Sequence, residues 1–223
     1  GSYPQLQDES IAWDAFYGSY VKTYLERDVR QLSAVQDLND FRKFMVAVAA
    51  RTGQVLNLTN IADEISKSLP TVSRWISILE SSGIIYLLEP YTNSVLKRAT
   101  QTPKLYFRDT GLAAYLTRWL TPETLANGAM SGAFFETFVI SEILKSFANC
   151  GIDYRYCVSY YRGRDKVKVN KDGTMYEKES EIDLIIEQDG ILYPIEIKKG
   201  LNISADQTAA FTVLDKIPEK KRG

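Results

Sequence analysis

One stretch of the chain, residues 181–198, constrains the fold more than any other. It consists of two runs rich in apolar and β-branched residues, separated by Asp189-Gly190. That dipeptide is preferred in two-residue type I′ turns, so the stretch predicts a β-hairpin. If Asp189 and Gly190 form the loop, Gln188 faces Ile191, and this pair sets the register of the whole hairpin.

The predicted register brings charged residues together. Asp183 falls opposite Glu196, and Glu181 falls opposite Lys198. Because strand side chains alternate between faces, Glu196 and Lys198 share one face. Two carboxylates about 5 Å apart repel by roughly 3 kcal/mol at an effective dielectric constant near 20. A divalent cation removes that repulsion, so the hairpin predicts a site for Mg²⁺ or Mn²⁺.

A lysine beside such a pair suits metal-assisted hydrolysis of a phosphodiester. Asp183 and Glu196, with the Ile197 carbonyl, would hold the metal, and Lys198 would position the attacking water and stabilise developing charge. Taken one at a time, these residues are more often ordinary charges on an exposed hairpin face. The combination of Asp, Glu-x-Lys and one register is what favours the metal site.

Composition excludes several other kinds of chemistry. The 223 residues include no histidine, which excludes a Ser-His-Asp triad and His-ligated zinc. Cys150 and Cys157 are too few for a disulfide framework and favour a reducing, cytoplasmic location. No apolar run is long enough to span a membrane. With a net charge of −1, nucleic acid would have to bind through local basic patches.

The first half of the chain shows helical spacing. Apolar residues three and four apart predict helices over about 8–30 and 38–51, the second ending at Gly53. Two shorter helices follow, the first capped by Thr59 or Asn60.

The second short helix has Pro70 in its first turn. With a strand over 84–88, the pattern predicts a helix-turn-helix with a wing. The buried face of this helix is expected to carry Val72, Trp75, Ile76 and Leu79.

This region has few basic residues with which to bind DNA. The outward face of the second short helix carries one arginine, Arg74. The following segment adds four residues that would contact phosphates: Lys97, Arg98, Lys104 and Arg108. DNA binding and protein docking therefore both stay open for this helix-turn-helix.

A loop with Pro122 and Gly128 predicts a domain boundary after residue 122. A long helix over about 131–147 follows, and Glu136 lies within its apolar stripe. A half-buried Glu136 would supply a third carboxylate to the metal site, but a glutamate at a helix edge that reaches solvent gives the same pattern.

The segment before the hairpin is basic. A strand over about 154–162 is expected to lead into a long hairpin loop before the first carboxylate strand, and a helix over about 204–216 is expected after the 181–198 hairpin. The loop's charges would contact a phosphate backbone, or would simply be solvated. The residues expected to bind nucleic acid are Arg162, Arg164 and Lys166.

These elements resemble the restriction-endonuclease-like superfamily with the PD-(D/E)XK motif. The order is helix with Glu, strand, strand with Asp, then strand with Glu-x-Lys. Glu136, Asp183, Glu196 and Lys198 match that motif residue by residue. The resemblance implies a mixed sheet and assigns catalytic roles to Lys198 and Glu136 and metal binding to Asp183 and Glu196.

Five segments more closely resemble the C-terminal part of bacterial and archaeal predicted AAA-type ATPases. In that family an ATPase module precedes a winged helix and a nuclease-like domain. The chain contains no Gly-x-x-x-x-Gly-Lys-Ser/Thr loop, so ATP is expected to bind only through an upstream module. The resemblance also implies a further strand after the last helix. The segments are 20–28 (YVKTYLERD), 50–54 (ARTGQ), 104–112 (KLYFRDTGL), 135–139 (FETFV) and 193–199 (YPIEIKK).

The sequence thus predicts an α+β protein. A helical and winged-helix module over 1–122 precedes a restriction-endonuclease-like α/β core with a mixed sheet over 123–223. The expected function is DNA binding with Mg²⁺- or Mn²⁺-dependent cleavage, alongside an upstream AAA-type ATPase domain. The alternative is a non-catalytic DNA-binding or protein-docking module that regulates the ATPase. Self-association into a homo-oligomer also stays open.

Overall fold

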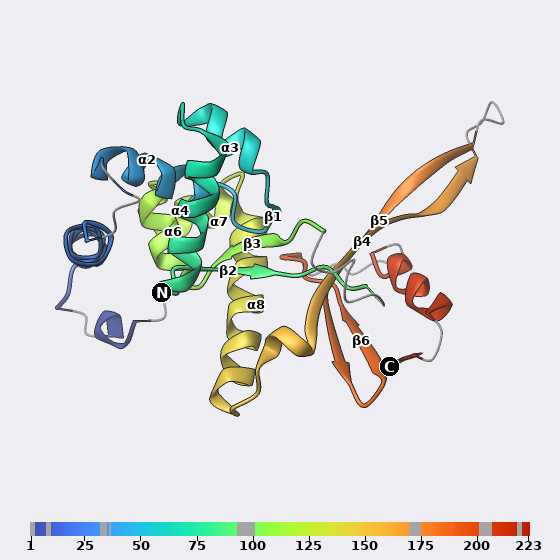
Figure 1. Ribbon diagram of the computed structural model, residues 1–223. Helices are drawn as coiled ribbons and strands as arrows, with labels where there is room; N and C mark the ends of the chain where they lie inside the picture. Colours follow the sequence, from blue (N-terminus) through green and yellow to red (C-terminus); the bar gives the residue numbers. More distant parts are fainter. Residues whose placement is uncertain are drawn as a thin grey trace. The chain divides into compact units, whose positions relative to one another are not determined.

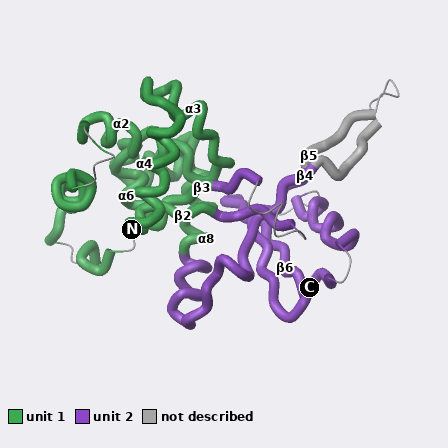
Figure 2. Tube along the Cα trace, viewed as in Figure 1, with its two compact units in different colours: residues 1–87, 105–141 green, residues 88–104, 142–223 purple. Residues whose placement is uncertain are grey.

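The computed structural model forms two compact units (Figure 2). Unit 1 comprises residues 1–87 and 105–141, and unit 2 comprises residues 88–104 and 142–223. The linear division after residue 122 stays a prediction, because contacts in space rather than chain order define these units. The structure describes residues 3–7, 10–31, 35, 37–92, 101–169, 175–200, 207–217 and 220–223, without the side chains of 164–169 and 175–179.

Unit 1 is built mainly from helices around a three-stranded sheet of order β1-β3-β2 (Figure 1). The last helix, α8, continues from unit 1 into unit 2. The elements are η1 (Pro4–Gln7), α1 (Trp13–Thr23), η2 (Tyr24–Val29), α2 (Leu38–Ala49), β1 (Gln54–Val55), α3 (Leu58–Glu64), α4 (Leu69–Ser81), β2 (Ile85–Leu88), β3 (Lys104–Phe107), α6 (Thr110–Leu116), α7 (Pro122–Asn127) and α8 (Ser131–Asn149).

The predicted helix-turn-helix corresponds to α3 and α4. Asn57, rather than Thr59 or Asn60, caps α3, because its side chain accepts the Asn60 N–H at 2.9 Å. Ser68 caps α4, and Pro70 lies in its first turn as predicted. The strand β2 follows, so the order of elements agrees with the prediction.

The core of unit 1 is aromatic. The ring of Trp75 on α4 packs edge-on against Phe41 and Phe44 of α2, with ring centroids 5.2 and 5.3 Å apart. All four residues predicted for the buried face of α4 are buried: Val72, Trp75, Ile76 and Leu79.

Three local predictions for unit 1 need correction. The helix expected over about 8–30 is present, but it begins at Trp13 and changes to a π-helix over 24–29. The helix α2 ends with Ala50 as its C-cap, while Gly53 takes a φ of +80° beyond it. The loop expected around Pro122 is the helix α7, because Thr121 forms a capping box at its start.

Unit 2 contains the four-stranded sheet β4-β5-β6-β7. The strands β4, β5 and β6 pair antiparallel, and β7 pairs parallel with β6, so the sheet is mixed. Its core includes Tyr91, Ile182, Ile185, Leu192 and Leu214. The elements are η3 (Tyr154–Tyr156), β4 (Val158–Val169), β5 (Met175–Gln188), β6 (Ile191–Ile195), η4 (Ala209–Lys216) and β7 (Lys221–Arg222).

The α+β class is confirmed, but two predicted elements of unit 2 differ from the structure. The basic segment after residue 162 is not a loop, because β4 continues through Val169 and pairs with β5 as a long ribbon (Figure 1). The predicted helix over 204–216 is a 3-10 helix over 209–216, and residues 201–206 lie outside the described part. Among described residues, every helix is too short or too polar to cross a membrane.

Candidate carboxylate and lysine site

The hairpin of β5 and β6 forms as predicted. Asp189 and Gly190 have positive φ angles of 52° and 76°, as a type I′ turn requires. Gln188 pairs with Ile191, and the ladder continues to Leu184 opposite Ile195. The predicted pair of Asp183 and Glu196 comes next in this register, directly after the last residue of β6.

A β-bulge lies at Asp183. The register of β4 against β5 shifts between Ser159 and Tyr161, so Tyr160 alone lies opposite Asp183 and Leu184. A bulge redirects side chains and is common beside active sites. The Asp183 carboxylate Oδ2 accepts the backbone N–H of Ile197 at 2.8 Å. The side chain of Asp183 therefore fixes the backbone that carries the Glu-x-Lys motif.

Three of the four predicted catalytic and metal-binding residues converge here. Asp183 is 5% exposed, and its Oδ2 lies 3.6 Å from the Nζ of Lys198. That Nζ lies 2.5 Å from Oε1 of Glu196. The Lys198 side chain is 47% exposed, so it reaches solvent from a site whose carboxylates are largely buried.

Glu196 is the carboxylate with an open position. Its Oε2 is buried and has no hydrogen-bond partner among the residues that the structure describes. Burial raises the pKa of Glu196; the neighbouring Asp183 charge raises it further, and the hydrogen bond from Lys198 opposes the shift. An unpartnered buried carboxylate oxygen is unfavourable, and a bound cation would satisfy it.

Lys104 is a second lysine at this site. Lys104 was predicted from the sequence as a phosphate contact, but it is only 2% exposed, which does not suit that role. Its Nζ lies 2.5 Å from Oε1 of Glu181 and 3.8 Å from Oδ1 of Asp183. Lys104 lies almost 80 residues before these partners in the sequence, and no local pattern links it to the hairpin.

The donor atoms fit a hard divalent cation in part. Asp183 and Glu196 offer carboxylate oxygens, which are the ligands that Mg²⁺ prefers. The three carboxylates of Glu181, Asp183 and Glu196 exceed the two ammonium groups of Lys104 and Lys198 by one, so the ionised site carries one net negative charge. In the described part of the chain, no group of three or more acidic or cysteine side chains is arranged to hold a metal. A cation at this site would therefore meet no more than two carboxylates of the described residues.

Glu136, the predicted third carboxylate, belongs to unit 1. It lies half-buried on α8, and its Oε1 accepts a hydrogen bond from the Tyr106 hydroxyl at 2.5 Å. The sequence left open whether Glu136 is half-buried or reaches solvent at the helix edge, and the structure has it half-buried; its role at the metal site stays a prediction.

The predicted nucleic-acid-binding residues lie in both units. Arg74 is exposed on α4, and Arg162 is exposed on β4, where it pairs in register with Glu181. Arg108 is also exposed and lies over the Tyr86 ring. Two predicted residues, Arg164 and Lys166, lie on β4 without described side chains, and two, Lys97 and Arg98, lie outside the described residues.

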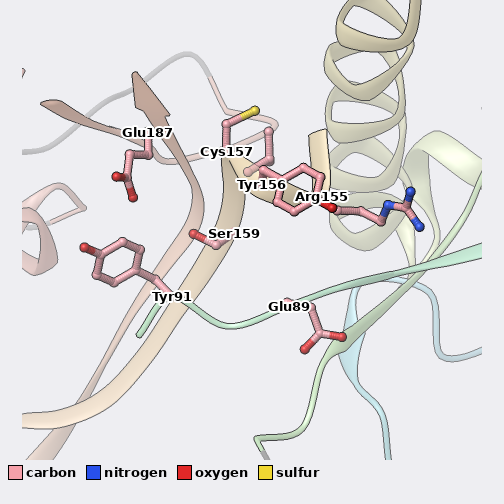
Figure 3. Close-up of a pocket in the computed structure, with 8 residues that line it drawn as sticks. Glu89, Tyr91, Arg155, Tyr156, Cys157, Ser159 and Glu187 are labelled. Carbon is pink, nitrogen blue, oxygen red and sulfur yellow. The ribbon is translucent and has the colours of Figure 1, made fainter. Parts of the chain in front are cut away.

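Two hollows elsewhere do not add catalytic groups. The hollow in unit 2 near Tyr91 and Glu187 has a volume of about 10 Å³, which is room for about one water (Figure 3). Burial raises the pKa of the Cys157 thiol that lines it, so a reactive thiolate is disfavoured. The hollow in unit 1 is larger, about 370 Å³, and is lined mostly by apolar groups including Trp13 and Trp119.

The raised pKa of Glu196 predicts a pH effect in metal-free protein. Folded Glu196 holds its proton more tightly than the unfolded chain does, so its contribution to stability falls as pH rises above the usual value of 4.5. We expect the free energy of unfolding of the wild type, relative to Glu196→Gln, to decrease from that pH toward neutrality. Urea unfolding with a chelator present measures this difference. A difference that is constant, or that grows with pH, would contradict the prediction.

Comparisons with known proteins give family membership without an activity. Residues 1–123 match the family described as a domain of unknown function, DUF8612, and residues 131–223 match the domain of unknown function DUF4143. Two uncharacterized proteins, from Mycobacterium bovis and Mycobacterium tuberculosis, are each 25% identical over 208 residues. The match covers 93% of this chain but 42% of each relative, so the chain spans less than half of their length.

No solved structure matches the chain. Of the two family matches, the first covers 123 of the 223 residues, which is more than half of the chain. The chain therefore belongs to the DUF8612 family, with a DUF4143 match following in its second part.

Proposed function

We propose that unit 2 carries a divalent-cation-dependent nuclease site. The observation that supports it most is the convergence of Asp183, Glu196 and Lys198, with Glu196 Oε2 left open. A bound Mg²⁺ or Mn²⁺ would polarise the scissile phosphate and activate water. Asp183 and Glu196 would hold the cation. Lys198, which is half-exposed, reaches the developing negative charge.

The proposed substrate is DNA, held through its phosphates. Arg162 is exposed on β4 in register with Glu181, beside the carboxylates, and Arg164 and Lys166 follow on the same strand. Basic side chains along one strand suit a phosphate backbone, which carries a regular row of negative charges. Arg74 on α4 is proposed as a contact from unit 1.

An ATPase domain is the proposed partner within a longer protein. The chain covers 42% of each curated relative, so those proteins contain other regions of considerable length. The resemblance to predicted AAA-type ATPases supplies the expectation that one such region binds ATP. In this proposal the carboxylate site acts on DNA that the ATPase moves or remodels.

The direct test is cleavage of plasmid and oligonucleotide DNA with Mn²⁺, with Mg²⁺ and with a chelator. We expect cleavage that requires the metal and that Asp183→Ala and Glu196→Gln each abolish. A matched control is Asp153→Asn, which removes a partly exposed carboxylate of unit 2 whose partner is Arg155. Activity that survives Asp183→Ala would rule out the site.

One observation favours a second function, a non-catalytic DNA-binding or protein-docking module. Asp183 already faces Lys104 at Oδ1 and the Ile197 N–H at Oδ2, so its charge is largely compensated by the protein itself. Calorimetric titration with Mn²⁺ separates the two functions. A saturable site that Glu196→Gln removes supports the nuclease, and the absence of any saturable site supports the docking module.

A further inference from the structure

Lys104 is a buried charge that the proposed chemistry does not use. Its side chain is 3% exposed at the start of β3, whereas the Lys198 side chain is 47% exposed. Burial of a lysine is costly unless its ammonium group is paired. The structure pairs it with Glu181 at 2.5 Å and places it 3.8 Å from Asp183. Lys104 thus neutralises charge that the bulged strand β5 brings together.

The contacts of Asp183 show what a cation must compete with. On one side, Oδ1 faces the Lys104 ammonium at 3.8 Å. On the other side, Oδ2 accepts the Ile197 N–H at 2.8 Å and lies 3.6 Å from Lys198. Lys198 can swing into solvent because it is half-exposed, but Lys104 has no such freedom. A divalent cation at Asp183 would therefore be repelled mainly by Lys104.

Tyr160 holds Lys104 in place. The Lys104 ammonium lies 5.6 Å from the centre of the Tyr160 ring, and the Tyr160 hydroxyl donates to the carbonyl of Thr102 at 2.5 Å. The backbone of Tyr160 also donates to Glu89 O at 3.1 Å and accepts from Tyr91 N at 2.6 Å. Tyr160, the residue opposite the bulge at Asp183, is thus hydrogen-bonded to Glu89 and Tyr91 and to Thr102.

We propose that Lys104 is the resident counter-cation of this carboxylate site: a positioning residue that fixes Asp183 and lowers the affinity of the site for divalent cations. The inference rests on the proposed metal site. Lys104 stabilises the metal-free state by neutralising Glu181 and Asp183. The same charge opposes a cation that binds Asp183 and Glu196. The site consequently favours metal only at high concentration.

The test is Mn²⁺ binding by calorimetry for the wild type and Lys104→Met. Removal of a like charge several ångströms from the cation is expected to tighten Mn²⁺ binding by about tenfold or more. The variant is also expected to unfold at a lower temperature without metal, and Mn²⁺ should restore more stability to it than to the wild type.

Three variants serve as controls for this experiment. Lys104→Arg keeps the charge and should retain the wild-type affinity. Lys145→Met removes an exposed lysine of the same unit that pairs with Glu142, and it should have no effect. If Lys104→Met does not fold, the double variant Lys104→Met/Glu181→Gln also removes the Glu181 carboxylate that would lose its ion-pair partner. The same increase in Mn²⁺ affinity is expected for this double variant.

The outcomes separate this inference from the proposed function. Tighter Mn²⁺ binding by Lys104→Met than by the wild type supports the inference. If Lys104→Met binds Mn²⁺ and the wild type binds none, the inference is still supported, and only the proposed nuclease function is overturned. Wild-type binding that depends on Glu196 but is unchanged or weaker in folded Lys104→Met overturns the inference alone. No saturable binding by either protein overturns both.

Discussion

Replacement of Asp109 by alanine is expected to lower the free energy of unfolding by about 3 kcal/mol. Asp109 is 5% exposed and caps the helix α6, where its Oδ1 accepts the Leu112 N–H at 2.6 Å. The same Oδ1 accepts the hydroxyl of Tyr17 at 2.6 Å, and Tyr17 is fully buried. The alanine variant loses the cap, worth about 1 kcal/mol, and leaves a buried hydroxyl without its acceptor, which costs about 1–3 kcal/mol more.

The protonation of Tyr17 makes this prediction independent of pH near neutrality. Burial raises the pKa of the Tyr17 hydroxyl far above its ordinary value, and its hydrogen bond to Asp109 raises it further. The hydroxyl therefore stays protonated and needs an acceptor. The Tyr17 hydroxyl oxygen also packs against Gly111, so closely that a Cβ on residue 111 would clash with it. The hydroxyl therefore has little room to turn toward another acceptor.

Two variants control for the Asp109 prediction, and urea unfolding measures all of them. Asp109→Asn keeps an Oδ1 that accepts both hydrogen bonds and should cost about 1 kcal/mol or less. Asp37→Ala removes an exposed cap of α2, whose side chain accepts the Asn39 and Asp40 N–H groups, and should cost about 1 kcal/mol. Equal losses for Asp109→Ala and Asp37→Ala would show that the Tyr17 contact contributes nothing.

The hairpin was predictable because its determinants are local. Asp189-Gly190 selects a tight turn, and a two-residue turn fixes every pair of the ladder. The buried face of α4 was predictable for the same reason, because helical spacing alone decides which side chains share a face. These predictions needed only residues within one turn or one hairpin of each other.

What the sequence did not predict depends on contacts between distant segments. The position of Lys104 follows from the pairing of Tyr160 with Glu89 and Tyr91, which no periodicity encodes. The bulge at Asp183 adds one residue to β5 opposite β4, whereas the alternating pattern of the sequence predicts a regular ladder without an extra residue. The motif pointed to Asp183, but the structure was required to show that a second lysine already compensates the charge of its carboxylate.

The two lysines of the site are expected to differ in function because they differ in exposure. Lys104 is buried against Glu181 and is proposed to lower the affinity for the cation. Lys198 is half-exposed and lies 2.5 Å from Glu196, so it can leave that contact when a phosphate approaches. A charge that contacts the substrate only in the transition state lowers the barrier to reaction without tightening metal binding.

Lys198→Met is therefore expected to lower the rate of metal-dependent DNA cleavage by about 100-fold or more, while Mn²⁺ binding stays as tight as in the wild type or becomes tighter. Single-turnover cleavage at saturating DNA measures the first quantity, and calorimetry measures the second. Lys199→Met removes the adjacent exposed lysine and should leave both unchanged. If Lys198→Met loses Mn²⁺ binding in proportion to cleavage, Lys198 organises the carboxylates. If cleavage is unaffected, Lys198 has no part in the reaction, and charge stabilisation must come from the exposed Arg162 or from the cation alone.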